Sequence, residues 1–547
     1  MVDVKDLIRR NNELTGLNAA WRDYFDDIAA FCFPRKAYMN TLRNRGDRLK
    51  FNFLYDSTAI RALKTMASGF HSNLTNPSSK WFALETGDQQ YMEIREVQTW
   101  FRKVDEKIFS TLNNSNFDPV MQEFYMDVGG FGTGGILTLD DPQSIVRFSL
   151  APIGKVNLEE DAQGRICRVY VSFKLSAWAA YRRWGEAAGS KIVECHIDKP
   201  GQEFDFLHCV YPREERDAAQ DNSSNMPYAS VWINVAEAVK IIESGFFENP
   251  YAFGRFYKDP TDVMGYSPAM DVLADIKLLN AQQKTMLRAA MKQADPPMQA
   301  PSKGYMLPLN FNPAAMNYRD PKTNADALAP IDVGRGNLPI TLEIIQMEQK
   351  SIEKGFFVHV FRAISDITKQ MNNPEVQRII AESMVELGPV VGRITQETLS
   401  PLILRVFSIL YRGGHLPEPP SVLAGQNTSN WNVVYLSPLA RVQRESEMTS
   451  INSFLNTIGA VAAIKPQVLD LIDEDKTIAI IAKIKGVDPE MLRSQEDVDA
   501  MRQQRNAAVA AQAQLTAGQQ IADVVNTGAQ ADATMKQAAT SHNTPVR

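Results

Sequence analysis

Residues 267–294 have the sequence SPAMDVLADIKLLNAQQKTMLRAAMKQA, which predicts one long amphipathic helix. Ser267 is a typical N-cap residue, and Pro268 suits the first helical turn. At 1.5 Å per residue the helix would be roughly 42 Å long. Its apolar stripe consists of Leu273, Ile276, Leu279, Met286, Leu287 and Ala290. Because one narrow stripe cannot bury so long a helix within a small monomer, we expect it to pack against neighbours.

Residues 339–362, PITLEIIQMEQKSIEKGFFVHVFR, predict a second long helix. Between the two helices, residues 297–338 contain six prolines, a density that excludes long helices and favours an irregular compact segment. The two helices are therefore expected to form an antiparallel hairpin with an elaborated tip. We call this helical hairpin the stem. The residues expected to pack it are Leu273, Ile276, Leu279, Leu287, Leu342, Ile345 and Ile352.

The first 266 residues combine helices with a β-meander, which predicts an α+β fold. Apolar residues at helical spacing run from Leu7 to Phe31, and Pro34 is expected to end that helix. Apolar residues then recur at every second position. Within residues 167–175, Val169 and Val171 lie on one face and Tyr170 lies on the other. The predicted strands are residues 136–139, 146–150, 155–158, 167–175, 191–197, 204–211, 229–235 and 239–247, with a short helix near 178–184.

The chain beyond the second stem helix is expected to be mainly helical. A polar loop at 362–373 is followed by a helical stretch from Pro374 to about residue 412, which prolines should bend at 389 and 401. A strand is expected at 431–436 and an acidic helical region at 438–505. The Ala- and Gln-rich tail is low-complexity, which leaves two alternatives: a helix that needs partners, or disorder.

Composition excludes several classes of protein. The chain has 547 residues, with 58 Lys and Arg against 64 Asp and Glu, so its formal net charge is -6. Proteins that wrap nucleic acid are usually basic, so any contact with DNA should be local or weak. The four cysteines form no C-x-x-C pair, and the six histidines lack zinc-ligand spacing, so we expect no metal and no cofactor. A signal peptide and a membrane-spanning run are not expected either.

The glycine run at residues 129–135, GGFGTGG, invites comparison with a phosphate-binding loop. Such loops follow a strand and open a helix, whereas here a predicted helix precedes the run and a strand follows it. A helix-to-strand corner is therefore the preferred interpretation. No hydrolase elbow is recognisable, and the carboxylates are scattered, so we expect no catalytic residues and a protein that is not an enzyme.

A family resemblance rests on the N-terminal motifs and on the order of the predicted elements. Residues 54–59 are LYDSTA, and ASGF at 67–70 and LTNPSSKWF at 74–82 follow them. Together with two long helices around a proline-rich segment, this order resembles the head-to-tail connector (portal) proteins of short-tailed, T7-like bacteriophages. The resemblance covers about residues 5–500, and its motifs are diagnostic of the family but carry no chemistry.

This resemblance implies a division of the chain into portal regions. The wing would be residues 1–266, the stem helices 267–296 and 339–362, and a small α/β clip 297–338. A tunnel loop would occupy 363–377, a kinked helix and a strand crossing the wing 378–437, the crown 438–505, and the tail 506–547.

The resemblance also implies a function, partners and candidate sites. The function would be a ring of twelve copies at one capsid vertex, the conduit through which double-stranded DNA is packaged and ejected. Partners would be further copies of the chain, major capsid and scaffolding proteins, the large terminase subunit, the tail adaptor or tail tube protein, internal core proteins and weakly contacted DNA, with no membrane. The protein would be made in the host cytoplasm and reside in the virion.

The candidate residues of the DNA channel and tunnel loop are Arg362, Lys369, Gln370, Asn372, Asn373 and Arg378. Those of the clip, expected to contact motor or adaptor, are Lys303, Tyr305, Phe311, Tyr318 and Arg319. On its residues alone the polar loop is an ordinary solvated connection, as most such loops are. Two alternatives stay open. One is another virion protein, such as a tail or adaptor component. The other is a nuclease or ATPase of the packaging machinery, and the missing phosphate loop argues against the ATPase.

Overall fold

The computed structural model describes most of the chain in two compact units. The first unit consists of Met1–Asp88 and Trp100–Asn456, and the second of Gln89–Thr99 and Thr457–Arg547. The described residues are 3–36, 53–92, 94–216, 222–294, 298–299, 329–330, 338–367, 386–423, 431–436, 451, 453–459, 475, 477–478, 481 and 495–540.

Helices form the start of the first unit. Asn18 divides the predicted single N-terminal helix, and this correction leaves α1 (Val4–Leu17) and α2 (Ala19–Cys32). The break follows from a polar contact, because Asn18 donates a hydrogen bond to the buried Asn157 at 3.1 Å. The remaining helices before the sheets are α3 (Thr58–Leu74), α4 (Gln89–Met92), α5 (Arg95–Asn113) and α6 (Phe117–Phe131), of which α4 and the start of α5 belong to the second unit.

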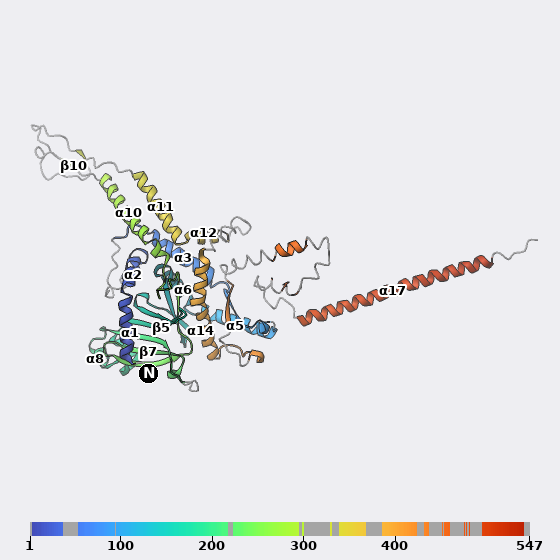
Figure 1. Cartoon of the computed structure of the whole chain (residues 1–547), viewed down its shortest axis with the longest axis horizontal. Coiled ribbons are helices and arrows are strands. Elements are labelled where there is room, and N and C mark those ends of the chain that lie inside the picture. Colours follow the sequence, from blue (N-terminus) through green and yellow to red (C-terminus); the bar gives the residue numbers. More distant parts are fainter. Residues whose placement is uncertain are drawn as a thin grey trace, which may run out of the picture. The chain divides into compact units, whose positions relative to one another are not determined.

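Two antiparallel sheets follow (Figure 1). The larger is a five-stranded meander in the order β4-β5-β6-β7-β8, and the smaller has the order β3-β2-β9. Their strands are β2 (Thr133–Asp141), β3 (Ile145–Leu150), β4 (Val156–Glu160), β5 (Ile166–Ser176), β6 (Glu203–Pro212), β7 (Tyr228–Asn234), β8 (Val239–Phe246) and β9 (Tyr251–Arg255).

The alternation predicted along β5 is confirmed by what covers its two faces. Val169 and Val171 pack into a cluster with Phe253 of the smaller sheet, whereas Tyr170 packs into a cluster with Leu7 of α1. The meander is thus sandwiched between a helix and a second sheet, which explains why both faces of β5 are partly apolar.

One predicted strand is wrong. Residues 191–197 belong to the helix α8 (Ser190–Asp198), which follows α7 (Ala177–Trp184). Ile192 is fully buried in a cluster with Phe206, and the ring of His196 stacks on Tyr181 at 3.7 Å. A short β-branched run does not distinguish strand from helix by its period, so tertiary packing decides. The strand β9 was not among the predicted strands.

The stem consists of four helical pieces: α9 (Pro268–Asp271), α10 (Leu273–Ala294), α11 (Leu338–Gly355) and α12 (Val358–Ile367). The predicted continuous helices at 267–294 and 339–362 are therefore both interrupted, at Val272 and at Phe356–Phe357. Because α12 extends to Ile367, the first five residues of the predicted tunnel loop are helical. Figure 1 shows α10 and α11 side by side, with β10 (Met298–Gln299) beyond α10; β10 pairs with β11 (Ala329–Pro330).

The long helical stretch after the loop is described from residue 386. Helical residues 386–394 continue into a π-helical turn, Thr395–Leu399, and then into α14 (Ser400–Arg412). A π turn therefore interrupts the regular α-helix just before Pro401, whereas the helix runs through Pro389 without an interruption. The strand β12 (Trp431–Tyr435) pairs antiparallel with β1 (Phe82–Thr86), which links the segment after α14 to the segment after α3.

The second unit contains the helix α17 (Gln495–Thr540), so the helical alternative for the tail holds as far as Thr540. The short described pieces of the predicted crown, 451–481, are also helical. Among the described residues, no helix is both long and apolar enough to cross a membrane.

Candidate functional site: the stem hairpin and its base

The base of the stem hairpin is buried within a single chain. Leu273, Ile276 and Leu279 of α10 and Ile345 and Ile352 of α11 are all buried. These five were among the seven residues expected to pack the stem, and they hold α10 and α11 against each other and against the body.

Farther along, the hairpin exposes apolar side chains. Leu287 is 44% exposed and Leu342 is 42% exposed, although both were expected to pack the stem. Four further large apolar residues of α10 and α11 share this exposure: Leu278, Met291, Ile344 and Met347. Exposed apolar side chains at six positions of these two helices are available for contact with another protein.

The glycine run positions the start of the stem. It forms the expected corner between α6 and β2, and Gly132 has a φ of 76°, the left-handed conformation that suits glycine. The Ser267 hydroxyl donates to the carbonyl of Gly130 at 2.8 Å and accepts from the Met270 N–H at 3.2 Å. The N-cap of α9 is therefore attached directly to the corner.

A buried ionic cluster fixes the π-helical turn that precedes α14. Arg255 of β9 is 2% exposed, and its guanidinium bonds Glu397 of the π turn at 2.7 and 3.0 Å. It also bonds Glu160 of β4, which pairs with Lys258 at 2.6 Å. Since an unpaired buried charge is strongly unfavourable, this cluster holds the π turn against both sheets.

Of the six candidate residues of the DNA channel, Arg362 is the one that lies among the described residues. It lies on α12, is exposed, and pairs with Glu353 through two contacts of 3.2 Å. The other five channel candidates, Lys369, Gln370, Asn372, Asn373 and Arg378, lie outside the described residues. So do the five clip candidates, Lys303, Tyr305, Phe311, Tyr318 and Arg319.

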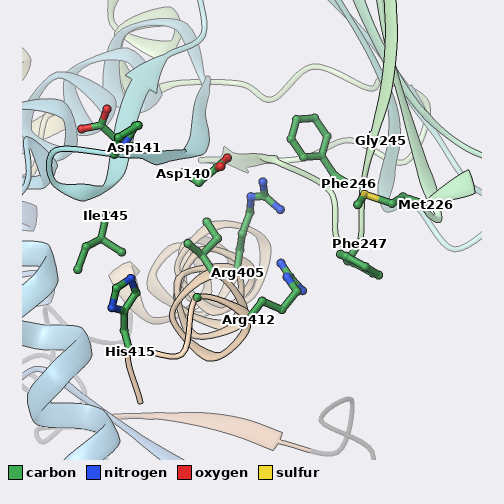
Figure 2. A pocket seen from close by; sticks show the side chains of 13 residues that line it. Asp140, Asp141, Ile145, Met226, Gly245, Phe246, Phe247, Arg405, Arg412 and His415 are labelled. Atoms are coloured by element: carbon green, nitrogen blue, oxygen red, sulfur yellow. The ribbon is translucent and has the colours of Figure 1, made fainter. Parts of the chain in front are cut away.

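A cavity of about 570 Å³ lies beside the end of α14 (Figure 2). Arg405 and Arg412 of α14 share the carboxylate of Glu248, with contacts of 3.3 Å from Arg405 and 2.7 Å from Arg412. Burial lowers the pKa of Arg405 to about 10, which leaves it cationic at neutral pH. The two arginines therefore tie the connection between β8 and β9 to α14 through one shared carboxylate.

Catalytic geometry is not evident in the described part of the chain. No group of three or more His, Cys, Asp or Glu side chains there could hold a metal ion. His208, the most buried histidine described, lies between the hydroxyls of Tyr251 and Ser230, both at 2.9 Å, and burial lowers its pKa to about 3. It is therefore a neutral core residue.

Comparisons with known proteins agree with the resemblance seen in the sequence. The portal protein of Salmonella phage epsilon15 is 31% identical over 518 residues, covering 93% of this chain and 92% of that protein. A probable portal protein of Bordetella phage BPP-1 is 29% identical over 508 residues, covering 92% and 91%.

Among solved structures, the neck of an empty gene transfer agent particle matches 76% of this chain and 92% of that chain at 12% identity. Its TM-score of 0.33 is too low to support a conclusion. The sequence model of the family described as "Bacteriophage head to tail connecting protein" matches residues 4–492. This match spans most of the chain, which therefore belongs to the bacteriophage head-to-tail connecting protein family.

Proposed function

We propose that twelve copies of this connector form a closed ring at one capsid vertex, through which double-stranded DNA is packaged and later ejected. The observation that carries the proposal is the exposed apolar surface of the stem, exemplified by Leu287 and Leu342. In a closed ring each stem hairpin would have a neighbour on either side, and heterologous contacts would remove these side chains from water.

The charge of the chain supports passage of DNA in preference to tight binding. Affinity for DNA grows with each phosphate contacted by Lys or Arg, so a strongly basic channel would hold DNA in place. The net charge is -6, and the channel candidate Arg362 is paired with Glu353. We therefore infer weak contacts with DNA along the channel.

The remaining partners follow from the order of the segments. We propose that residues 297–338 bind the large terminase subunit during packaging and the tail adaptor or tail tube protein afterwards. The wing would contact major capsid and scaffolding proteins, and the crown the internal core proteins. The protein would be made in the host cytoplasm before it is built into the virion.

Electron microscopy of the purified full-length protein tests the ring. The proposal predicts closed rings with twelve-fold symmetry and a central channel wide enough for double-stranded DNA. Compact single copies, or open filaments at every condition that permits assembly, would contradict it.

A packaging assay tests the role of the loop after α12. Because α12 ends at Ile367, a deletion within residues 368–376 shortens the loop and leaves the described helix intact. If this loop prevents backward movement of DNA, capsids assembled with the deleted protein should lose packaged DNA. Normal retention would refute the valve role but leave the ring proposal untouched.

A further inference from the structure

The segment directly before α3, part of the LYDSTA motif, contacts both long helices of the stem. The Asn280 side chain of α10 accepts a hydrogen bond from the Tyr55 N–H and donates one to the Phe53 carbonyl, both at 2.7 Å. This pairing uses both ends of one amide group, as the edge of a neighbouring strand would. It explains why a polar residue interrupts the apolar stripe of α10.

The same segment holds α11. Gln349 donates to one carboxylate oxygen of Asp56 at 3.0 Å, while the other oxygen accepts from the Thr58 N–H at 2.7 Å. One carboxylate therefore satisfies an N–H group at the start of α3 and also binds the stem. In addition, the Lys284 ammonium of α10 lies 5.7 Å from the centre of the Tyr55 ring, within range of a cation–π contact.

Both helical arms of the hairpin, α9–α10 and α11–α12, are interrupted near its base. The break between α9 and α10 is at Val272, and the break between α11 and α12 includes Phe357 at a φ of 55°. A positive φ is unusual for a bulky residue and persists only where surrounding contacts hold it. The two breaks are adjacent, because Gly355 lies against the Val272 side chain.

We propose that residues 53–56 are a latch that fixes the stem hairpin to the body, and that Val272 and Phe357 are its hinge. With the latch closed, Asn280 and Gln349 hold α10 and α11 in one orientation relative to α3. With the latch open, the hairpin turns about the two adjacent breaks. Asn280 and Gln349 are thus positioning residues, and their role within one chain does not depend on the proposed ring or its stoichiometry.

Hydrogen exchange of the full-length protein, followed by mass spectrometry, tests the latch. Asn280→Ala and Gln349→Ala should each accelerate exchange at residues 53–57 at least tenfold, and also accelerate exchange at 270–274 and 354–358. Gln283→Ala, a change of another polar residue of α10 without a bond to 53–56, is the matched control and should leave these rates unchanged. Exchange in β5 should not change in any variant.

The variant Asn280→Asp separates loss of the latch from general unfolding, because the Asp side chain has nearly the same shape as that of Asn. It keeps the oxygen that accepts from Tyr55 but loses the donor to Phe53, so its effect on residues 53–57 should be intermediate. Unchanged exchange at 53–57 in Asn280→Ala would overturn the latch. Faster exchange at 53–57 without any change at 270–274 and 354–358 would overturn the hinge, and general loss of protection in Asn280→Asp would overturn both.

Discussion

Gly355 at the end of α11 lies so close to Val272 that a Cβ atom there would be 2.4 Å from Val272 Cγ1. That distance is far below any normal contact, so only glycine fits here without a displacement of Val272. The contact joins the two breaks of the stem, and it fixes how closely the second stem helix approaches the first at the base of the hairpin.

Gly355→Ala should therefore destabilise the stem base. We expect the added methyl group to lower the free energy of unfolding by about 1–3 kcal/mol through overpacking, an effect larger than the gain in helix propensity. Thermal unfolding with hydrogen exchange at 352–360 measures the change. Gly392→Ala is the matched control, because it lies in a helix with open space at its Cβ position, and it should be neutral or slightly stabilising.

Arg255→Met should be far more damaging than Arg362→Met. Arg255 is buried and pairs with Glu160 of β4 and Glu397 of the π turn, whereas Arg362 is exposed and pairs with Glu353. We expect losses of about 3–5 kcal/mol for the buried residue and at most about 1 kcal/mol for the exposed one. Comparable melting temperatures for the two variants would show that the buried cluster does not hold the π turn.

Asp105 should make stability depend on pH. It is buried, accepts from the Leu84 N–H at 3.0 Å and lies 3.9 Å from Lys80. Burial raises its pKa to about 7, so the folded state keeps a proton that the unfolded state releases near pH 4. The stability this proton gives is present below pH 4 and is lost as the pH rises to about 7.

The comparison of wild type with Asp105→Asn isolates that effect, because the amide cannot ionise and its oxygen can still accept from Leu84. The melting temperature of the variant, measured relative to wild type, should be higher at pH 7.5 than at pH 4.5. A difference that is the same at both pH values would mean that Asp105 is ionised in the folded protein throughout this range.

Local periodicity predicted much of the fold, because each pattern has a local physical cause. The alternation of β5 reflects apolar cover on both faces, and the glycine run marks a helix end that needs a left-handed residue at Gly132. The N-cap at Ser267 was visible for the same reason. The prediction of a structural protein, as opposed to an enzyme, is confirmed by the family match.

What the sequence did not reveal depends on contacts between distant segments. The partners of Arg255 lie 95 and 142 residues away, so nothing near it indicates a buried ionic cluster. The break at Phe357 depends on the contact of Gly355 with Val272, and the role of the LYDSTA motif depends on Asn280, 225 residues after Tyr55. Candidates at 303–319 and 369–378 stay predictions.

The mass of the assembled protein tests the central claim, that neighbouring copies cover the exposed stem, most directly. Twelve chains of 61.2 kDa would have a mass of about 734 kDa. Native mass spectrometry should find that assembly for wild type. It should also find mainly single chains for Leu287→Glu combined with Leu342→Glu, because buried carboxylates oppose the contact.

The matched control combines Ile197→Glu with Leu17→Glu, which places the same two charges at exposed apolar positions of α8 and α1 and should still assemble. A wild-type protein that stays at 61.2 kDa under every assembly condition, or a stem variant that assembles as wild type does, would contradict the account.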